Sequence, residues 1–184
     1  MVYKAIDCDV LVIGAGGAGL RAAIAASDKR CKVIVASKTL LGKSHTVMAE
    51  GGINAALGNV DKEDNWRTHF ADTMIEGRFL SDYRLVETLT KSGPGVIFEL
   101  ERWGAIFDRT KNGMIDQRFF GAHRYRRACH TGDRIGLEII RTLEDMVRCR
   151  NIKVMEEVVV TKLLTKDNSV TGAAAIDIRR GEFF

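Results

Sequence analysis

Three glycines after a short apolar stretch are the residues of this sequence best suited to hold a charged ligand. Residues 9–19 read DVLVIGAGGAG, in which 10–13 predict a strand and Gly14, Gly16 and Gly19 lie in the turn that follows. The first glycine permits a tight turn, the second lets backbone N–H groups approach a phosphate, and the third lets the next helix pack closely. The pattern predicts a loop that binds the pyrophosphate of a dinucleotide.

The segments around this loop are those that such a site requires. The alanine-rich segment 19–27 predicts a helix, whose N-terminus would direct its partial positive charge at the phosphates. Segment 32–36 (KVIVA) predicts a second strand. The acidic residue that commonly follows such a strand and bonds the ribose hydroxyls is replaced by Ser37 and Lys38, which argues against a standard NAD site. A tight turn with no ligand is the alternative interpretation.

Composition sets the outer limits of the fold and excludes several classes of protein. A chain of 184 residues can bury one good core, so we expect one domain. Its hydrophobic content of 46% and charged content of 28% are ordinary for a globular protein, and no apolar run approaches the roughly 20 residues that span a bilayer. The N-terminus lacks the character of a signal peptide. The cysteines form no CxxC pair, so free thiols are expected rather than metal ligands: Cys8, Cys31, Cys129 and Cys149.

The rest of the chain predicts further helices and strands. Residues 61–80 and 81–103 have helical apolar spacing, with a break expected at Pro94 and a turn at 93–95. The glycine-rich stretch 51–59 is typical of a loop over a ligand. The remaining predictions are an amphipathic helix over 132–150 and two strands, 152–165 and 170–178, that meet at a turn over 166–169.

Six long blocks of the sequence together resemble the flavoprotein subunit of succinate dehydrogenase and fumarate reductase. The resemblance implies a three-layer α/β FAD-binding (Rossmann-like) domain with a parallel sheet. It also implies that residues 1–184 are the N-terminal part of that domain, C-terminally incomplete, with the capping and C-terminal helical domains absent. The blocks are DVLVIGAGGAGLRAA (9–23), SKTLLGKSHTVMAEGGINAALGN (37–59), DNWRTHFADT (64–73), GPGVIFELERWGAIFDR (93–109), IDQRFFG (115–121) and GDRIGLEIIRTL (132–143).

His45 is the sharpest implication of this resemblance. In the family, the histidine of the SHT segment is joined covalently to the 8α carbon of the flavin. A neutral imidazole nitrogen is a nucleophile, and the bond raises the flavin's reduction potential, which suits the removal of hydrogen from an unactivated C–C bond. The alternative is a histidine that only hydrogen-bonds the flavin or its own backbone.

The resemblance also implies which other residues bind FAD. Glu50 stands where many relatives have glutamine, and we expect its side chain to point away from the anionic reduced flavin or to be paired. Phe120 matches a phenylalanine that packs near the dicarboxylate substrate, and a core aromatic is the alternative. The expected FAD-binding residues are Gly14, Ala15, Gly16, Gly17, Ala18, Gly19, Ser37, Lys38, Ser44, His45, Thr46, Ala49, Glu50, Gly51 and Gly52.

Segment 118–134 carries five arginines and two histidines. One interpretation is the electrostatic attraction of a dianionic substrate, and an equally good one is a solvated or subunit-facing patch. Nucleic acid is not expected as a partner, because aromatic interleaving is limited to Tyr125 and no recognition motif is present.

By resemblance, the parent protein converts succinate to fumarate or runs the reverse. Electrons would pass through a partner iron–sulfur subunit to quinone, with membrane anchor subunits holding the cytoplasmic protein on the inner face of the cell membrane. The family's proton-transfer and substrate-clamping residues lie beyond position 184, so no catalytic acid or base is expected here and this chain alone should be inactive. Segment 121–133 also resembles L-aspartate oxidase, which lacks the SHT histidine, and a non-catalytic flavin-binding fragment is a further alternative.

Overall fold

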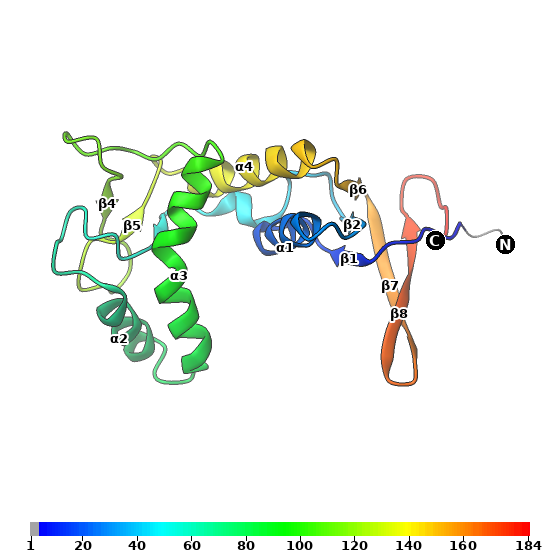
Figure 1. Cartoon of the computed structure of the whole chain (residues 1–184), viewed down its shortest axis with the longest axis horizontal. Coiled ribbons are helices and arrows are strands. Elements are labelled where there is room, and N and C mark those ends of the chain that lie inside the picture. The colour runs from blue at the N-terminus through cyan, green and yellow to red at the C-terminus, as the bar shows by residue number, and fades with distance from the viewer. Residues whose placement is uncertain (1–3) are drawn as a thin grey trace. The chain divides into compact units, whose positions relative to one another are not determined.

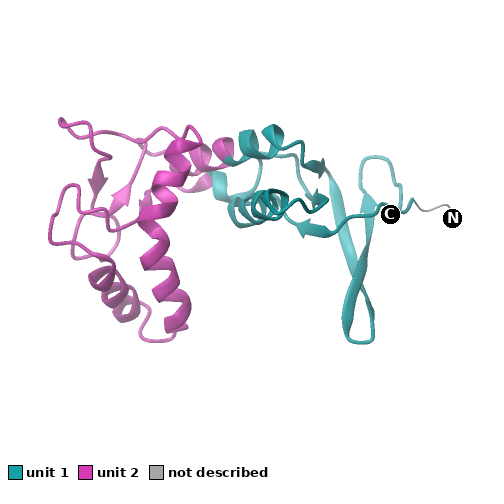
Figure 2. Cartoon of the chain, in the orientation of Figure 1, with its two compact units in different colours: residues 1–47, 143–184 teal, residues 48–142 magenta. Residues whose placement is uncertain are grey.

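The computed structural model describes residues 4–184, which divide into two compact units (Figure 2). Unit 1 comprises residues 4–47 and 143–184, and unit 2 comprises residues 48–142. Helix α4 (Ile135–Cys149) confirms the amphipathic helix predicted over 132–150. The boundary between the units at 142–143 lies inside this helix. Each unit is described below by itself.

Unit 1 is built on a parallel sheet of three strands in the order β1-β2-β6 (Figure 1). The strands are β1 (Val10–Ile13), β2 (Val33–Ala36) and β6 (Lys153–Met155), with Val10 beside Val33 and Val35 beside Val154. All four residues of β2 are buried, as expected for the central strand of a sheet covered on both faces. Helix α1 (Gly17–Asp28) connects β1 to β2 and packs against both.

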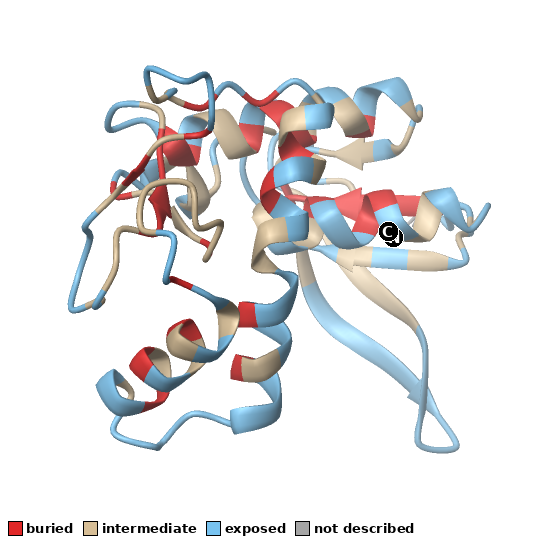
Figure 3. Cartoon of the chain, turned by 60° about the vertical axis from the view of Figure 1, so that its left-hand side comes forward, coloured by how far each residue is buried: buried red, intermediate tan, exposed pale blue. Residues whose placement is uncertain are grey.

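A long hairpin forms the remaining layer of unit 1. Strands β7 (Val158–Lys166) and β8 (Ser169–Asp177) pair antiparallel around a two-residue turn, where Asp167 and Asn168 have φ of 49° and 60°. Positive φ at both positions is typical of the tight turn that suits twisted strands. Together with α1 and the sheet, the hairpin gives the expected three-layer α/β fold. Figure 3 shows that much of the hairpin is exposed.

The single strand expected over 152–165 is wrong, because two strands with different partners occupy that range. β6 pairs in parallel with β2, whereas β7 pairs antiparallel with β8. Between them Glu157 has a φ of 55°, a left-handed conformation that reverses the chain at the edge of the parallel sheet. Apolar and β-branched residues lie on both sides of Glu156 and Glu157, so the sequence pattern does not show that the chain turns there.

Unit 2 contains two helices and a small antiparallel sheet. Helix α2 (Trp66–Glu76) begins after Asn65, whose side chain accepts hydrogen bonds from two backbone N–H groups of the first turn. Helix α3 (Tyr83–Arg102) begins after Asp82, whose side chain accepts a hydrogen bond from the backbone N–H of Arg84. The short strands β3 (Ile53–Asn54), β5 (Ala128–Cys129) and β4 (Gln117–Arg118) pair in that order. The chain passes from unit 1 to unit 2 within a short 3₁₀ helix, η1 (His45–Met48).

Helix α3 runs through Pro94, so the expected break and the turn over 93–95 are wrong. The buried residues on both sides of the proline, Val86, Thr90, Ile97 and Leu100, lie on one face of the helix. Their common packing holds the helix together where the proline removes one backbone hydrogen bond. Gly93 lies against Ala55, since a Cβ added at this glycine would be 3.6 Å from the Cβ of Ala55.

Candidate functional site

The glycine loop of unit 1 has the backbone conformation that its spacing predicts. Gly14 follows β1 with a φ of +110°, and its N–H donates a 2.8 Å hydrogen bond to the carbonyl of Ala36. A Cβ added at Gly19 would lie 2.0 Å from the carbonyl oxygen of Gly14, so only glycine lets α1 start this close to the strand. Both glycines are therefore required by the fold of the loop itself.

Gly16 differs from Gly14 and Gly19, because no contact among residues 4–184 requires a glycine there. A Cβ added at Gly16 would meet only ordinary contacts, the nearest being the hydroxyl oxygen of Thr46 at 3.5 Å. Gly16 is the N-cap residue of α1 and provides no capping side chain. A glycine that internal packing does not demand fits a loop whose backbone closely approaches a ligand.

Two hydroxyl side chains, one just before η1 and one within it, lie beside this loop. The Oγ1 of Thr46 accepts a 3.1 Å hydrogen bond from the N–H of Gly17, in the first turn of α1. The Oγ of Ser44 is buried and has no hydrogen-bond partner among residues 4–184, and it would lie 4.0 Å from a Cβ at Gly16. A buried orphan hydroxyl beside a helix N-terminus is suited to a phosphate group. The residues of the loop therefore fit a dinucleotide.

The other predicted residues of unit 1 lie close to this loop in the chain or the sheet. His45 is exposed at the first position of η1, between the two hydroxyl residues. Ser37 follows β2 and is buried, and its backbone bonds Met155 and Val158. Lys38 is exposed.

The predicted FAD-binding residues of unit 2 form one short segment, 49–52, whose carbonyl groups accept hydrogen bonds from other parts of the unit. The carbonyl of Ala49 accepts a 2.8 Å hydrogen bond from the N–H of Gly136 at the start of α4. The carbonyls of Glu50 and Gly51 both accept from the guanidinium of Arg118, each at 3.0 Å. The segment is therefore held in one conformation.

Phe120 lies against this segment. A Cβ added at Gly51 would be 2.4 Å from the ring of Phe120, so the ring packs directly on the glycine backbone. The side chain is nevertheless 54% exposed, so it lies outside the core of residues 4–184. Gly52 has a φ of +135°, and a Cβ there would lie 2.8 Å from the carbonyl oxygen of Cys129.

Sequence reasoning missed a buried polar cluster in unit 2 that is centred on Arg127. This side chain is fully buried, and its Nε and Nη2 donate to Asp64 at 3.1 and 2.7 Å. Its Nη2 also lies 3.0 Å from Asp72. Burial raises the pKa of Asp64 even though Arg127 opposes the change. The signal available in the sequence was the block DNWRTHFADT, which supplies both carboxylates.

Two histidines complete this cluster in neutral form. Burial, followed by the charge of Arg127, lowers the pKa of His69 to about 4 and also lowers the pKa of His123. The Nδ1 of His123 lies 3.4 Å from Arg127 and its Nε2 lies 2.8 Å from the side-chain amide of Asn54. A guanidinium only donates hydrogen bonds, so the Nδ1 of His123 accepts from Arg127 and the ring proton is on Nε2. That proton needs an acceptor, which the amide oxygen of Asn54 becomes when the nitrogen and oxygen of this amide are exchanged.

Four of the five arginines of segment 118–134 have partners within unit 2. Arg126 donates to Asp61 through its backbone and its guanidinium, and Arg124 lies 3.8 Å from Asp72. Arg127 and Arg118 bind the groups already described. Structural pairing therefore accounts for these four cations, and the attraction of a dianionic substrate is not needed to explain them.

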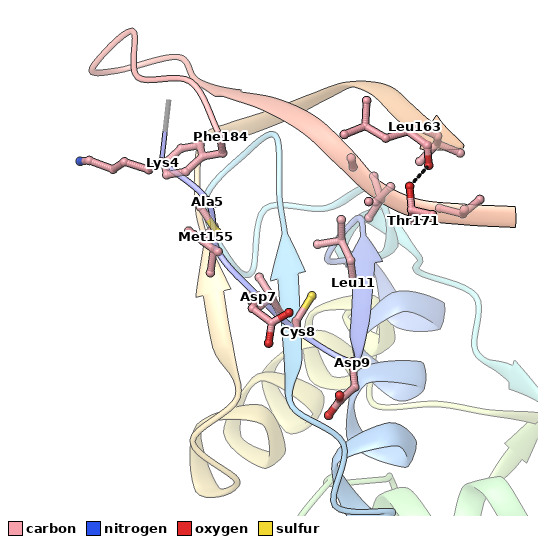
Figure 4. A pocket seen from close by; sticks show the side chains of 17 residues that line it. Lys4, Ala5, Asp7, Cys8, Asp9, Leu11, Met155, Leu163, Thr171 and Phe184 are labelled. Atoms are coloured by element: carbon pink, nitrogen blue, oxygen red, sulfur yellow. Dashed lines mark hydrogen bonds between the residues drawn. The ribbon is translucent and has the colours of Figure 1, made fainter. Parts of the chain in front are cut away.

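A cavity of about 580 Å³ lies in unit 1 between the parallel sheet and the hairpin (Figure 4). It is lined by apolar side chains such as Leu11, Met155 and Leu163, and none of the predicted site residues lines it. Leu11 and Ile13 of β1 belong to this lining and are 36% and 53% exposed. Lys4, Asp7 and Asp9 add charged groups to this lining.

Comparison with known families decides what the glycine loop belongs to. The family model described as "FAD binding domain" matches residues 9–184, across both units. The chain belongs to the FAD binding domain family. FAD is therefore its cofactor, and the fold predicted from the sequence is confirmed.

Individual relatives are close over nearly the whole chain. A fumarate reductase (CoM/CoB) subunit of Methanothermobacter marburgensis is 49% identical over 183 residues, covering 99% of this chain and 34% of the relative. A mitochondrial succinate dehydrogenase flavoprotein subunit of Xenopus laevis is 36% identical over 183 residues, covering 95% of this chain and 27% of the relative. The chain thus spans about a third of the length of the curated relatives it matches.

Solved structures agree in fold. Sdh1 of Mycobacterium smegmatis in complex with UQ1 matches with a TM-score of 0.93 and 46% identity, covering 96% of this chain and 31% of that one. The quinol fumarate reductase of E. coli matches with a TM-score of 0.91 and 32% identity, covering 97% and 30%. Among the helices of residues 4–184, none has the length and apolar character needed to cross a membrane.

Proposed function

We propose that this chain is the flavin-binding part of an FAD-dependent oxidoreductase that interconverts succinate and fumarate. The observation that carries the proposal is the 49% identity, over 99% of the chain, to a fumarate reductase subunit. The orphan hydroxyl of Ser44 and the unexplained glycine at position 16 support a bound cofactor independently of that likeness.

Bound FAD supplies two-electron chemistry, which the oxidation of a saturated dicarboxylate requires. The chain's own contribution is to bind and orient this cofactor. Backbone N–H groups at the start of α1 and the hydroxyl of Ser44 hold the pyrophosphate. The hydroxyl of Thr46 fixes the segment that carries His45 to the N–H of Gly17.

We assign His45 as the point of covalent attachment to FAD. Its exposure and its place between two residues that lie beside the loop support this assignment. Precipitation with acid should leave yellow flavin with the protein, whereas His45→Ser should bind FAD and release it on precipitation. Flavin that washes away from the wild-type protein would contradict the covalent bond and favour a non-covalent flavoenzyme such as L-aspartate oxidase.

Phe120 is proposed to border the substrate, because its ring is half exposed and packs on Gly51, one of the predicted FAD-binding residues. The relatives are named as subunits, which supports assembly with membrane anchor subunits and with an iron–sulfur subunit. Such partners would place the protein peripherally on the membrane.

Turnover by the native protein that contains this sequence tests the proposal. The protein is purified from its source, and fumarate-dependent oxidation of a reduced dye is compared with succinate-dependent reduction of an oxidised one. Activity with fumarate or succinate, and none with L-aspartate, is the expected result. Oxidation of L-aspartate without any reaction with succinate or fumarate would refute the proposal.

A further inference from the structure

The side chain of Arg118 makes hydrogen bonds in unit 2 that the proposed function does not explain. It lies in β4, yet its guanidinium reaches the segment before β3, which is on the far side of β5 in the sheet. Its Nε donates to the carbonyl of Gly51 and its Nη2 to the carbonyl of Glu50, each at 3.0 Å. One guanidinium therefore fixes two successive peptide groups.

Fixing these two carbonyls also fixes two N–H groups. All peptide bonds of the described chain are trans, so the N–H of each peptide points opposite to its carbonyl. The N–H groups of Gly51 and Gly52 must therefore point away from Arg118. Neither N–H has a hydrogen-bond partner among residues 4–184, although Gly51 is buried. A buried N–H without a partner is costly, which favours a ligand acceptor at this place.

The surrounding contacts keep the two peptides from rotating. Gly136 holds the preceding carbonyl of Ala49, and the ring of Phe120 packs on Gly51. The backbone of Gly52 is confined by the carbonyl of Cys129. Two adjacent N–H donors held in advance on one side of a chain stabilise an electron-rich acceptor without reorganising when its charge increases.

We propose that Arg118 is a positioning residue that sets the N–H groups of Gly51 and Gly52 as donors to the flavin ring. The inference rests on the proposed function, because the acceptor is the FAD of that function. The reduced flavin carries more negative charge than the oxidised one, so these donors bind the reduced form more tightly. Arg118 therefore raises the reduction potential of the bound flavin.

The test measures that potential by equilibration with reference dyes in the FAD-loaded protein. Arg118→Lys keeps the charge but replaces a planar fork by a single ammonium, which cannot span both carbonyls. We expect the preference for the reduced flavin to fall about tenfold, which lowers the potential by about 30 mV for two electrons. Arg118→Gln should lower it at least as far, and Arg141→Lys, an exposed arginine of the same unit, should leave it unchanged.

The reduction potential of the bound flavin distinguishes a positioning role of Arg118 from a general structural role. A variant that only loosens the fold loses affinity for oxidised and reduced flavin alike, and its potential stays at the wild-type value. An unchanged potential in both Arg118 variants would therefore overturn the inference and leave the proposed function intact. A wild-type protein that holds no FAD would overturn both.

Discussion

Replacing Arg127 by methionine should destabilise the protein strongly, because the change leaves two buried carboxylates without their cation. The Arg127 side chain is 0% exposed, and the side chains of its partners Asp64 and Asp72 are 1% and 6% exposed. Removing one member of a buried ion pair typically costs about 3–5 kcal/mol. In a protein of this size, a loss of about 4 kcal/mol lowers the melting temperature by roughly 10 °C.

Urea titration and thermal melting followed by circular dichroism measure this loss, with Arg126→Met as the matched control. Arg126 is the preceding residue and also pairs with an aspartate, Asp61, but its side chain is 43% exposed. Asp61 keeps its hydrogen bond from the backbone N–H of residue 126 in the variant, so the control should cost about 1 kcal/mol or less. Equal losses in the two variants would show that burial does not decide the strength of these pairs.

Three further predictions concern the loop and the buried histidine. Gly19→Ala should abolish FAD binding, since its Cβ would lie 2.0 Å from the carbonyl oxygen of Gly14; fluorescence titration with FAD would detect any binding that survives. The folded-state pKa of His69, about 4, is below its unfolded value of 6.5, so its contribution to stability is complete above pH 6.5. Urea titrations should show that up to about 3 kcal/mol of the free energy of unfolding is lost between pH 6.5 and 4. His69→Phe should remove this pH dependence, and the same pH dependence in the variant as in the wild type would refute the prediction. Thr46→Val should reduce the fraction of acid-stable flavin, whereas Thr46→Ser, which keeps the acceptor for Gly17, should restore it; equal fractions in both variants would contradict the tether.

The sequence predicted those parts of the fold that depend on local pattern. The strand ending at Ile13, the glycine turn and the helix after it each follow from residues adjacent in the chain. The hairpin turn at Asp167 and Asn168 was equally predictable, because both residue types tolerate positive φ. The positions of the predicted loop residues agree with these local rules.

Features that depend on partners distant in sequence were not predictable in the same way. Pro94 stays inside a helix because the face packed on either side of it outweighs one missing hydrogen bond. The pairing of Arg127 with Asp64 joins residues 63 positions apart, and nothing local marks either as buried. The bonds from Arg118 to the carbonyls of Glu50 and Gly51 likewise appear only once the strand order β3-β5-β4 is known.

Titration of the purified chain with FAD tests the central claim most directly. Quenching of flavin fluorescence should saturate at one FAD per chain in the wild-type protein. Gly16→Val should show no saturable binding while keeping the wild-type melting temperature, because a branched side chain there meets little of the protein but occupies the path of the pyrophosphate. Binding by Gly16→Val as tight as that of the wild type would contradict the account, since the loop would then be a structural turn only.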